Sequence, residues 1–124
     1  MNWSAIAAVF LGLGVCIGAF GAHALQGHLD DYSRGIYETG VLYHFFHALG
    51  LLIVSMLPRT GAVTEARANT VCWLLAAGIL LFSGSLYALA ISGVRTLGAI
   101  TPIGGVAFIA AWAMLAYSLV RRSQ

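Results

Sequence analysis

The sequence is short of charge. Charged residues make up 8% of its 124 residues, lysine is missing, and hydrophobic residues reach 60%. A soluble domain averages about 25% charged residues. A soluble fold of the present composition would have too little polar surface to stay dissolved. The composition therefore indicates an integral membrane protein.

A basic surface is missing as well. The six arginines and four acidic residues leave a net charge of only +2. Proteins that bind nucleic acid gather lysine and arginine in one patch or stripe. The arginines are scattered along this chain, so we expect no nucleic-acid partner.

The only two cysteines, Cys16 and Cys72, do not predict a disulfide. Cys16 is expected in the outer part of a first membrane span, and Cys72 near the inner start of a third. Because a helix rises about 1.5 Å per residue, their heights differ by roughly 13 Å. A disulfide needs Cα atoms within about 7 Å, so we expect two small buried hydrophobic residues instead.

Four apolar runs are long enough to cross a bilayer, which takes about 20 residues each. They cover about residues 3–22, 36–57, 68–91 and 102–120. The first run lacks the basic start of a signal peptide, so we expect it to be a span. Thr101 suits the N-cap of the fourth, and Pro102 its first helical position. We predict an all-α fold, in which residues 1–124 form one domain, a polytopic membrane bundle of four helices.

The segment 29–39, just before the second run, is polar. Asp30 or Asp31 can cap a helix there, so we expect a short interfacial helical segment that runs into the second span. Arg34 and Glu38 are its interfacial residues. On a continuous helix Glu38 points away from the histidines that follow. Either the helix breaks just after it, or Glu38 faces the headgroups and Arg34.

The arginines predict the orientation, because cytoplasmic loops carry an excess of positive residues. The N-terminus, the 58–67 loop and the C-terminus share one side of a four-span topology. That side carries Arg59, Arg67, Arg121 and Arg122, and the other side carries Arg34 and Arg95. We therefore expect both termini in the cytoplasm.

Small residues recur four positions apart on several spans, which lets helices approach closely in lipid. The pairs are Gly14 with Gly18, Gly84 with Ala88, and Ala107 with Ala111. They predict the faces through which the helices pack.

Polar side chains inside membrane spans are costly, so they usually face the bundle interior and mark candidate functional sites. In the expected topology they gather in the outer half of the bundle. The candidate ligand-binding or polar cluster is His23, Tyr43, His47, Ser83, Ser85, Tyr87, Thr101, Gly105 and Trp112. A histidine there can also simply hydrogen-bond a neighbouring helix and hold it in register.

His44 and His47 share one face of the second span, and imidazole suits zinc, copper or iron. A metal would need a ligand from another helix, and only His23 is available. A haem would need axial histidines at matched depth, whereas His23 and His47 are offset. The three histidines stay as candidate metal ligands, and no cofactor is predicted. A haem or a metal ion remains an alternative.

Four motifs resemble a known family. They are the run Gly-Ala-Phe-Gly-Ala-His-Ala-Leu at 18–25, Tyr43 with His47-Ala48-Leu49, Phe-Ser-Gly-Ser-Leu-Tyr at 82–87, and Thr-Pro-Ile-Gly-Gly at 101–105 with Trp112. In order and spacing they are similar to the YgdD-like domain-of-unknown-function family of small membrane proteins (DUF423, or transmembrane protein 256-like). The resemblance implies four transmembrane helices, a place in the bacterial inner (plasma) membrane, and no established activity.

The same resemblance implies a set of signature residues. They are His23, Glu38, Tyr43, His47, Ser83, Gly84, Ser85, Tyr87, Pro102, Gly104, Gly105 and Trp112. The chain departs from the family pattern at His44, where glutamine is usual. His44 is then not essential to any shared chemistry, and His23 with His47 remains the pair of interest.

We expect a non-enzymatic binding or accessory protein, because the residues offer no set of nucleophile, base and acid. Its outer-leaflet cluster would hold a membrane lipid, another lipid-like ligand, or a helix of a partner protein or second copy. One alternative is a small transporter or proton-coupled carrier that uses His23, His47 and Tyr43. A second alternative is a redox subunit that binds haem or a metal.

Overall fold

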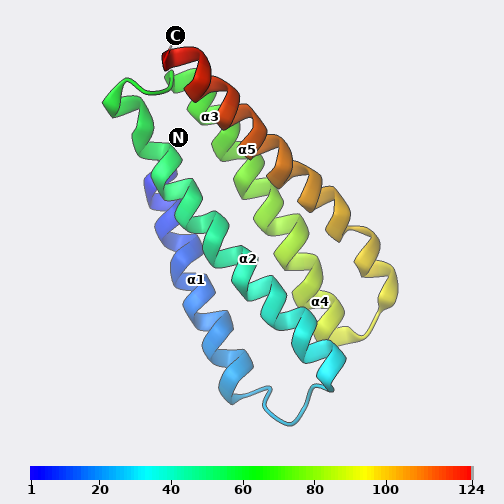
Figure 1. Cartoon of the computed structure of the whole chain (residues 1–124). Coiled ribbons are helices and arrows are strands. Elements are labelled where there is room, and N and C mark those ends of the chain that lie inside the picture. The colour runs from blue at the N-terminus through cyan, green and yellow to red at the C-terminus, as the bar shows by residue number, and fades with distance from the viewer. Residues whose placement is uncertain (124) are drawn as a thin grey trace.

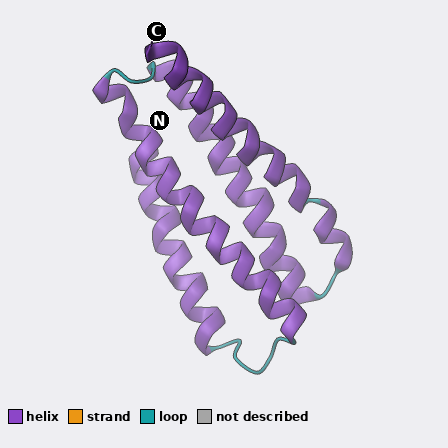
Figure 2. Cartoon of the chain, viewed as in Figure 1, coloured by secondary structure: helices purple, strands orange, loops and turns teal. Residues whose placement is uncertain are grey.

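The computed structural model describes residues 1–123, and every regular element in that range is helical (Figure 2). The elements are α1 (Trp3–His23), α2 (Asp31–Met56), η1 (Leu57–Thr60), α3 (Glu65–Gly78), η2 (Ile79–Ser83), α4 (Gly84–Ser92), η3 (Arg95–Ala99) and α5 (Thr101–Ser123). η1 and η3 are 3-10 turns, whereas η2 is a wider π-helical turn. The all-α prediction is confirmed.

Four spans run along the molecule, each antiparallel to its neighbour in the chain (Figure 1). α2 continues into η1, and α3, η2 and α4 form one span, Glu65–Ser92. The N-terminus, the loop after η1 and the C-terminal end of α5 lie at one end of the bundle (Figure 1). The loops after α1 and α4 lie at the other end. The prediction of four helices long and apolar enough to cross a membrane is confirmed, and each helix overlaps its expected range.

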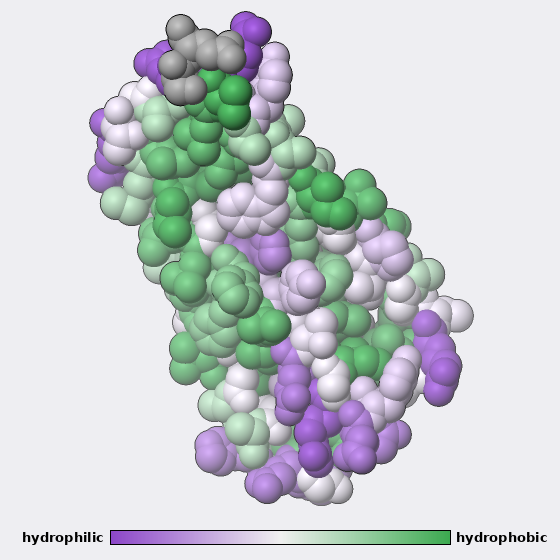
Figure 3. Space-filling model, viewed as in Figure 1, coloured by the Kyte–Doolittle hydropathy of each residue, from purple (hydrophilic) through white to green (hydrophobic). Residues whose placement is uncertain are grey.

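α2 and the third span form the centre of the bundle. α1 packs chiefly on α2, and α5 packs chiefly on α3 and η2. Only 11% of the α1 span is buried, against 50% of the third span. α1 and α5 therefore turn most of their surface outward, and Figure 3 shows that this surface is largely apolar between hydrophilic ends.

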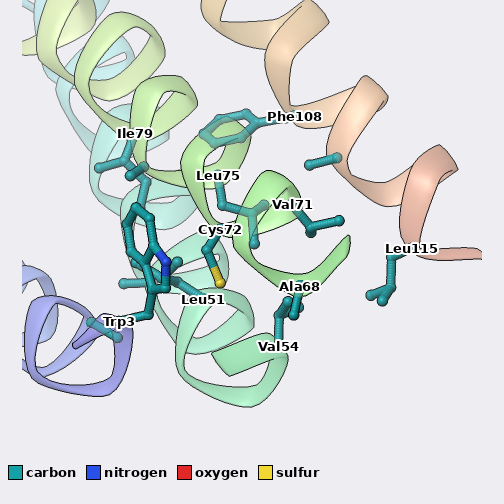
Figure 4. Close-up of a cluster of buried hydrophobic side chains, with 14 of the residues drawn as sticks. Trp3, Leu51, Val54, Ala68, Val71, Cys72, Leu75, Ile79, Phe108 and Leu115 are labelled. Atoms are coloured by element: carbon teal, nitrogen blue, oxygen red, sulfur yellow. The ribbon is translucent and has the colours of Figure 1, made fainter. Parts of the chain in front are cut away.

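The apolar core lies in the half of the bundle near the N-terminus (Figure 4). Its most enclosed side chains are Leu51, Val54, Val71, Cys72 and Leu75. Trp3 extends the core from α1, and its indole N–H donates a hydrogen bond of 2.8 Å to Oδ1 of Asn69. Lipid is as apolar as these side chains, so close packing and such interhelical bonds hold the helices together.

Cys16 and Cys72 have different surroundings, and both thiols are free. Cys72 is part of the core, as predicted. Cys16 is exposed, so the expectation that it is buried is wrong. The reason is that α1 contacts the bundle through a single face, and Cys16 lies outside that face.

Glycines mark two of the helix contacts. A Cβ on Gly14 would lie 3.1 Å from the Phe45 ring, and one on Gly18 would lie 3.6 Å from Val41, so this pair packs on α2 as predicted. The closest approach joins α5 to η2. A Cβ on Gly104 would lie 2.4 Å from the backbone nitrogen of Phe82. Only glycine allows two helix backbones to come so close.

The prediction for Gly84 and Ala88 is wrong. Within residues 1–123, a Cβ on Gly84 would meet no atom closer than 4 Å, and Ala88 is exposed. The π-helical turn η2 comes immediately before Gly84. Its wider turn shifts the register of the residues that follow, so the pair faces outward instead of toward another helix. Of the last pair, Ala111 is completely buried.

The polar segment before the second run is helical, as predicted, but it forms the first turns of α2 itself. Asp30 is the N-cap, and its carboxylate accepts a hydrogen bond of 2.7 Å from the Ser33 N–H. This bond lowers the pKa of Asp30 below the ordinary carboxyl value. The helix does not break after Glu38, which is exposed. The option of a helix break is therefore wrong, and the orientation of Glu38 toward the headgroups and Arg34 stays a prediction.

Candidate functional site

The expected polar cluster divides into separate groups. His23 ends α1 and is exposed, so it does not join the other candidates. His44 joins Tyr87, and Ser83 bonds the backbone of α2. Ser85 joins Thr101. His47 lies apart from these, beside Tyr43 and Trp112.

His44 links three helices. Its Nε2 lies 2.7 Å from the carbonyl oxygen of Phe10 on α1, and its Nδ1 lies 2.8 Å from the hydroxyl of Tyr87 on α4. A carbonyl only accepts, so Nε2 carries the hydrogen and Nδ1 accepts from the tyrosine. The ring is 3% exposed. Both nitrogens are engaged, and the residue is a structural link.

The sequence placed Tyr87 with His47, whereas the structure pairs it with His44. The two histidines are three positions apart, which separates them by about 60° around a helix. That angle directs His44 toward α1 and α4 and His47 toward α5. Helical periodicity assigns residues to a face that is wider than 60°, so it could not separate the directions of His44 and His47.

Two serines and a threonine join the third span to its neighbours. The Ser83 hydroxyl donates 2.7 Å to the carbonyl of Gly40, which ties η2 to α2. The Ser85 hydroxyl donates 2.9 Å to the Phe82 carbonyl and lies 2.6 Å from Oγ1 of Thr101. With its own hydrogen committed, Ser85 accepts from the threonine. Thr101 is the first residue of α5, where it was expected to be the N-cap.

His47 has one engaged nitrogen and one free nitrogen. Nδ1 donates 2.8 Å to the carbonyl of Tyr43, one turn earlier in α2. The ring stacks on Phe108 of α5, with centroids 3.5 Å apart and planes 15° apart. Within residues 1–123, no hydrogen bond reaches Nε2.

The free nitrogen of His47 reaches the molecular surface. The side chain is only 7% exposed. In the described chain, however, no enclosed side-chain nitrogen or oxygen lacks a partner. Nε2 has none, so it is not enclosed. The fixed Nδ1–H makes this atom a hydrogen-bond acceptor as long as the ring is neutral.

His47 lines a groove between α2 and α5. The groove has a volume of about 590 Å³. Its lining is Leu42, Tyr43, Phe46, His47, Leu49, Gly50, Ile53 and Trp112. We call it the α2–α5 groove. Figure 3 shows a small group of residues of hydrophilic colour that interrupts the apolar surface midway along the molecule.

Gly50 shapes the floor of the α2–α5 groove. A Cβ at this position would lie 2.7 Å from Cη2 of Trp112, so the indole rests directly on the backbone of α2. The ring of Trp112 lies 5.8 Å from that of His47, and Tyr43 lies at the same distance on a nearly parallel plane. Gly105 lies outside the groove and packs beside Phe82.

A second groove separates α1 from α2 at the end with the loop after α1. It has a volume of about 540 Å³, and Gly18, Val41 and Phe45 are among its apolar lining residues. Arg34 and Glu38, the two predicted interfacial residues, also line it. We call it the α1–α2 groove. It contains none of the predicted polar cluster.

The three histidines considered for a metal do not come together. Among residues 1–123, no three side chains of histidine, cysteine, aspartate or glutamate are close enough to share an ion. His44 has both nitrogens engaged, and His23 is at the exposed end of α1. His47 keeps Nε2 without a hydrogen bond, but His23 lies apart from it on another helix, so the two do not form a ligand pair.

The fold defines a class, a four-helix integral membrane protein, here with a groove between α2 and α5. The chain belongs to the family described as "Protein of unknown function (DUF423)", whose model matches residues 17–105. The family resemblance seen in the sequence is confirmed.

Curated relatives are similar over most of the chain. The UPF0382 membrane protein YwdK of Bacillus subtilis (strain 168) is 49% identical over 113 residues, which are 88% of this chain and 88% of the relative. The UPF0382 membrane protein SH2409 of Staphylococcus haemolyticus is 48% identical over 106 residues, 86% of this chain and 84% of the relative. No solved structure matches the chain.

Proposed function

We propose that this protein is a non-enzymatic binding protein that holds one lipid-like molecule in the α2–α5 groove. The observation that carries the proposal is the free Nε2 of His47, a polar atom at a groove whose lining is largely apolar and whose other polar side-chain groups are the Tyr43 hydroxyl and the Trp112 indole N–H. A polar group at membrane depth is costly without a partner. Ligand sites typically combine apolar walls with very few polar groups, in volumes of about 300–1,000 Å³.

The groove is suited to a ligand that comes from the bilayer. Leu42, Phe46, Leu49 and Ile53 line it and are also exposed on the outer surface of α2 in part or in full. The apolar wall of the groove is thus continuous with the lipid-facing surface. An amphiphile could move sideways into it without passing through water.

The carrier alternative has less support from the geometry. It would need His23, His47 and Tyr43 along one path. His23 is exposed at the end of α1, and α1 contacts the bundle chiefly through α2. His47 faces α5 on the other side of α2.

We further propose that the protein lies in the inner membrane with both termini in the cytoplasm. The end of the bundle that holds both termini carries Arg59, Arg67, Arg121 and Arg122. The opposite end carries Arg34 and Arg95. The positive-inside rule supports this orientation.

Native mass spectrometry of the full chain, extracted in a mild detergent, tests the binding proposal. We expect one amphiphile per chain to remain bound. Leu49→Trp should displace it, because an indole at this half-exposed lining position fills the groove. Ile109→Trp is the matched control, since Ile109 faces outward on α5 away from the lining.

Two results would refute the binding proposal. One is a spectrum that contains only excess detergent. The other is a bound amphiphile that Leu49→Trp and Ile109→Trp retain equally. A co-purifying protein that Leu49→Trp releases would show instead that a partner helix occupies the groove.

A further inference from the structure

We infer that the α2–α5 groove selects an aromatic lipid that carries a hydroxyl group, of the hydroquinone type with an apolar tail. This inference rests on the proposed function and names the class of its ligand. Binding alone is inferred, with no electron-transfer step.

The tautomer of His47 sets the direction of a hydrogen bond between its Nε2 and a ligand. Nδ1–H is held by the Tyr43 carbonyl at 2.8 Å, so Nε2 of the neutral ring can accept a hydrogen bond and cannot donate one. None of the four acidic residues lines the groove, so none is placed there to stabilise an imidazolium. A charged ring without a counter-ion is disfavoured at membrane depth. The ligand must therefore supply the donor to Nε2, while the Tyr43 hydroxyl and the Trp112 indole N–H of the same lining can donate to an acceptor on the ligand.

The walls of the groove favour a planar ring. Tyr43, Phe46 and Trp112 line it, and the imidazole of His47 itself is stacked on Phe108. Aromatic rings pack on one another in offset or edge-to-face geometry with a gain beyond simple burial. A hydroxyl-bearing aromatic head meets both the free acceptor and these rings, whereas an aliphatic alcohol meets only the acceptor.

The remaining lining residues suit an apolar tail. Leu42, Leu49 and Ile53 continue the groove along α2 and offer no polar group. A chain attached to the ring can lie along them and extend into the bilayer. Most membrane phospholipids have no aromatic ring, so the head group is what distinguishes this ligand.

The fixed acceptor also predicts discrimination between oxidation states. A hydroquinone has two O–H donors. The corresponding quinone has only carbonyl acceptors, which cannot bond an acceptor nitrogen. A hydroquinone hydroxyl can donate to Nε2 and can also accept from the Tyr43 hydroxyl or the Trp112 indole N–H, whereas a quinone carbonyl can only accept. The groove should therefore bind the reduced form in preference to the oxidised form, although the two have nearly the same shape.

Competition binding on the full chain tests the inference. The protein is placed in nanodiscs of phosphatidylethanolamine and phosphatidylglycerol, and tritiated decyl-trimethylhydroquinone serves as the probe. Its ring is fully substituted, so the oxidised form cannot add to the free thiols of Cys16 and Cys72. Competitors are the unlabelled hydroquinone, its dimethyl ether, its quinone and decanol. Empty nanodiscs give the lipid background.

We expect the hydroquinone to compete about fivefold or more better than the dimethyl ether and the quinone, which is the effect of one uncharged hydrogen bond. Decanol should be weaker still, since it lacks the ring. His47→Phe keeps a planar ring against Phe108 and removes the acceptor, so it should abolish the difference between hydroquinone and ether. His28→Phe, in the exposed loop after α1, is the matched control and should preserve that difference.

The comparison of ligands on the unaltered protein stands even if His47→Phe does not fold. Equal binding of the hydroquinone, its ether and its quinone would overturn the inference, while an amphiphile released by Leu49→Trp would leave the proposed function intact. Decanol binding as well as the hydroquinone would also overturn the aromatic preference. No saturable binding of any competitor, together with no effect of Leu49→Trp in mass spectrometry, would refute both.

Discussion

At the scale of single residues, the two histidines of α2 differ in how many ring nitrogens are hydrogen-bonded. His44 gives one nitrogen to the Phe10 carbonyl and the other to the Tyr87 hydroxyl. His47 gives one nitrogen to its own helix and leaves the other free at the α2–α5 groove. The first residue therefore holds helices together, and the second is available to a ligand.

Substitutions of His44 should show that its two hydrogen bonds stabilise the fold. Gln can donate to the Phe10 carbonyl and accept from Tyr87, so His44→Gln should retain stability. This also agrees with the glutamine that the family resemblance implies at this position. His44→Leu loses both bonds and should lower the free energy of unfolding by about 1–2 kcal/mol. Unfolding in mixed detergent and SDS measures both variants. Equal stability of His44→Leu and the unaltered protein would contradict a structural role.

The sequence predicted which residues are unusual but not which ones meet. Periodicity placed His44 and His47 on one face, and both are indeed buried in α2. It could not resolve the 60° between them, nor the rotation of α1, α4 and α5 that decides their partners. The backbone carbonyls of Phe10 and Gly40 were missed for the same reason, because a carbonyl leaves no signal in a sequence pattern.

At the scale of elements, the third span has a feature that hydropathy does not reveal. Its apolar length predicted one uninterrupted helix, and the span is continuous. The π-helical turn η2 lies within it, at the point where Gly104 of α5 meets the backbone of Phe82. Such turns within helices often occur at functional sites. Here the turn coincides with a close contact between two helices, which a hydropathy pattern does not reveal.

Gly104 should tolerate no side chain. A Cβ would lie 2.4 Å from the Phe82 nitrogen, and a backbone cannot give way as a flexible side chain can. We expect Gly104→Ala to lower the free energy of unfolding by about 1–3 kcal/mol, the usual effect of overpacking. Gly84→Ala is the matched control on the other side of η2, where the space is open. It should be neutral or stabilising by about 0.5–1 kcal/mol. If the two variants unfold alike, α5 does not approach η2 as closely as described.

At the scale of the whole molecule, the number of spans and their approximate limits followed from composition and hydropathy alone. The arrangement of the spans did not. α1 lies at the edge of the bundle and packs chiefly on α2, while the third span is central. All four are apolar enough to face lipid or protein, so hydropathy cannot tell an edge helix from a central one. The prediction that Cys16 is buried was wrong because α1 is an edge helix.

The positions of the arginines predict the orientation of the whole molecule in the membrane. Single cysteines can test it in a Cys16→Ala background, since Cys72 is buried and thiols in apolar surroundings are inert. His28→Cys lies in the loop after α1, and Ala66→Cys lies in the exposed first turn of α3 at the opposite end. In intact cells a membrane-impermeant maleimide should label His28→Cys and should reach Ala66→Cys only after permeabilisation. The reverse pattern would place both termini outside. Labelling of both positions in intact cells would show that the arginine bias is too small to fix one topology, because four residues against two is a modest excess.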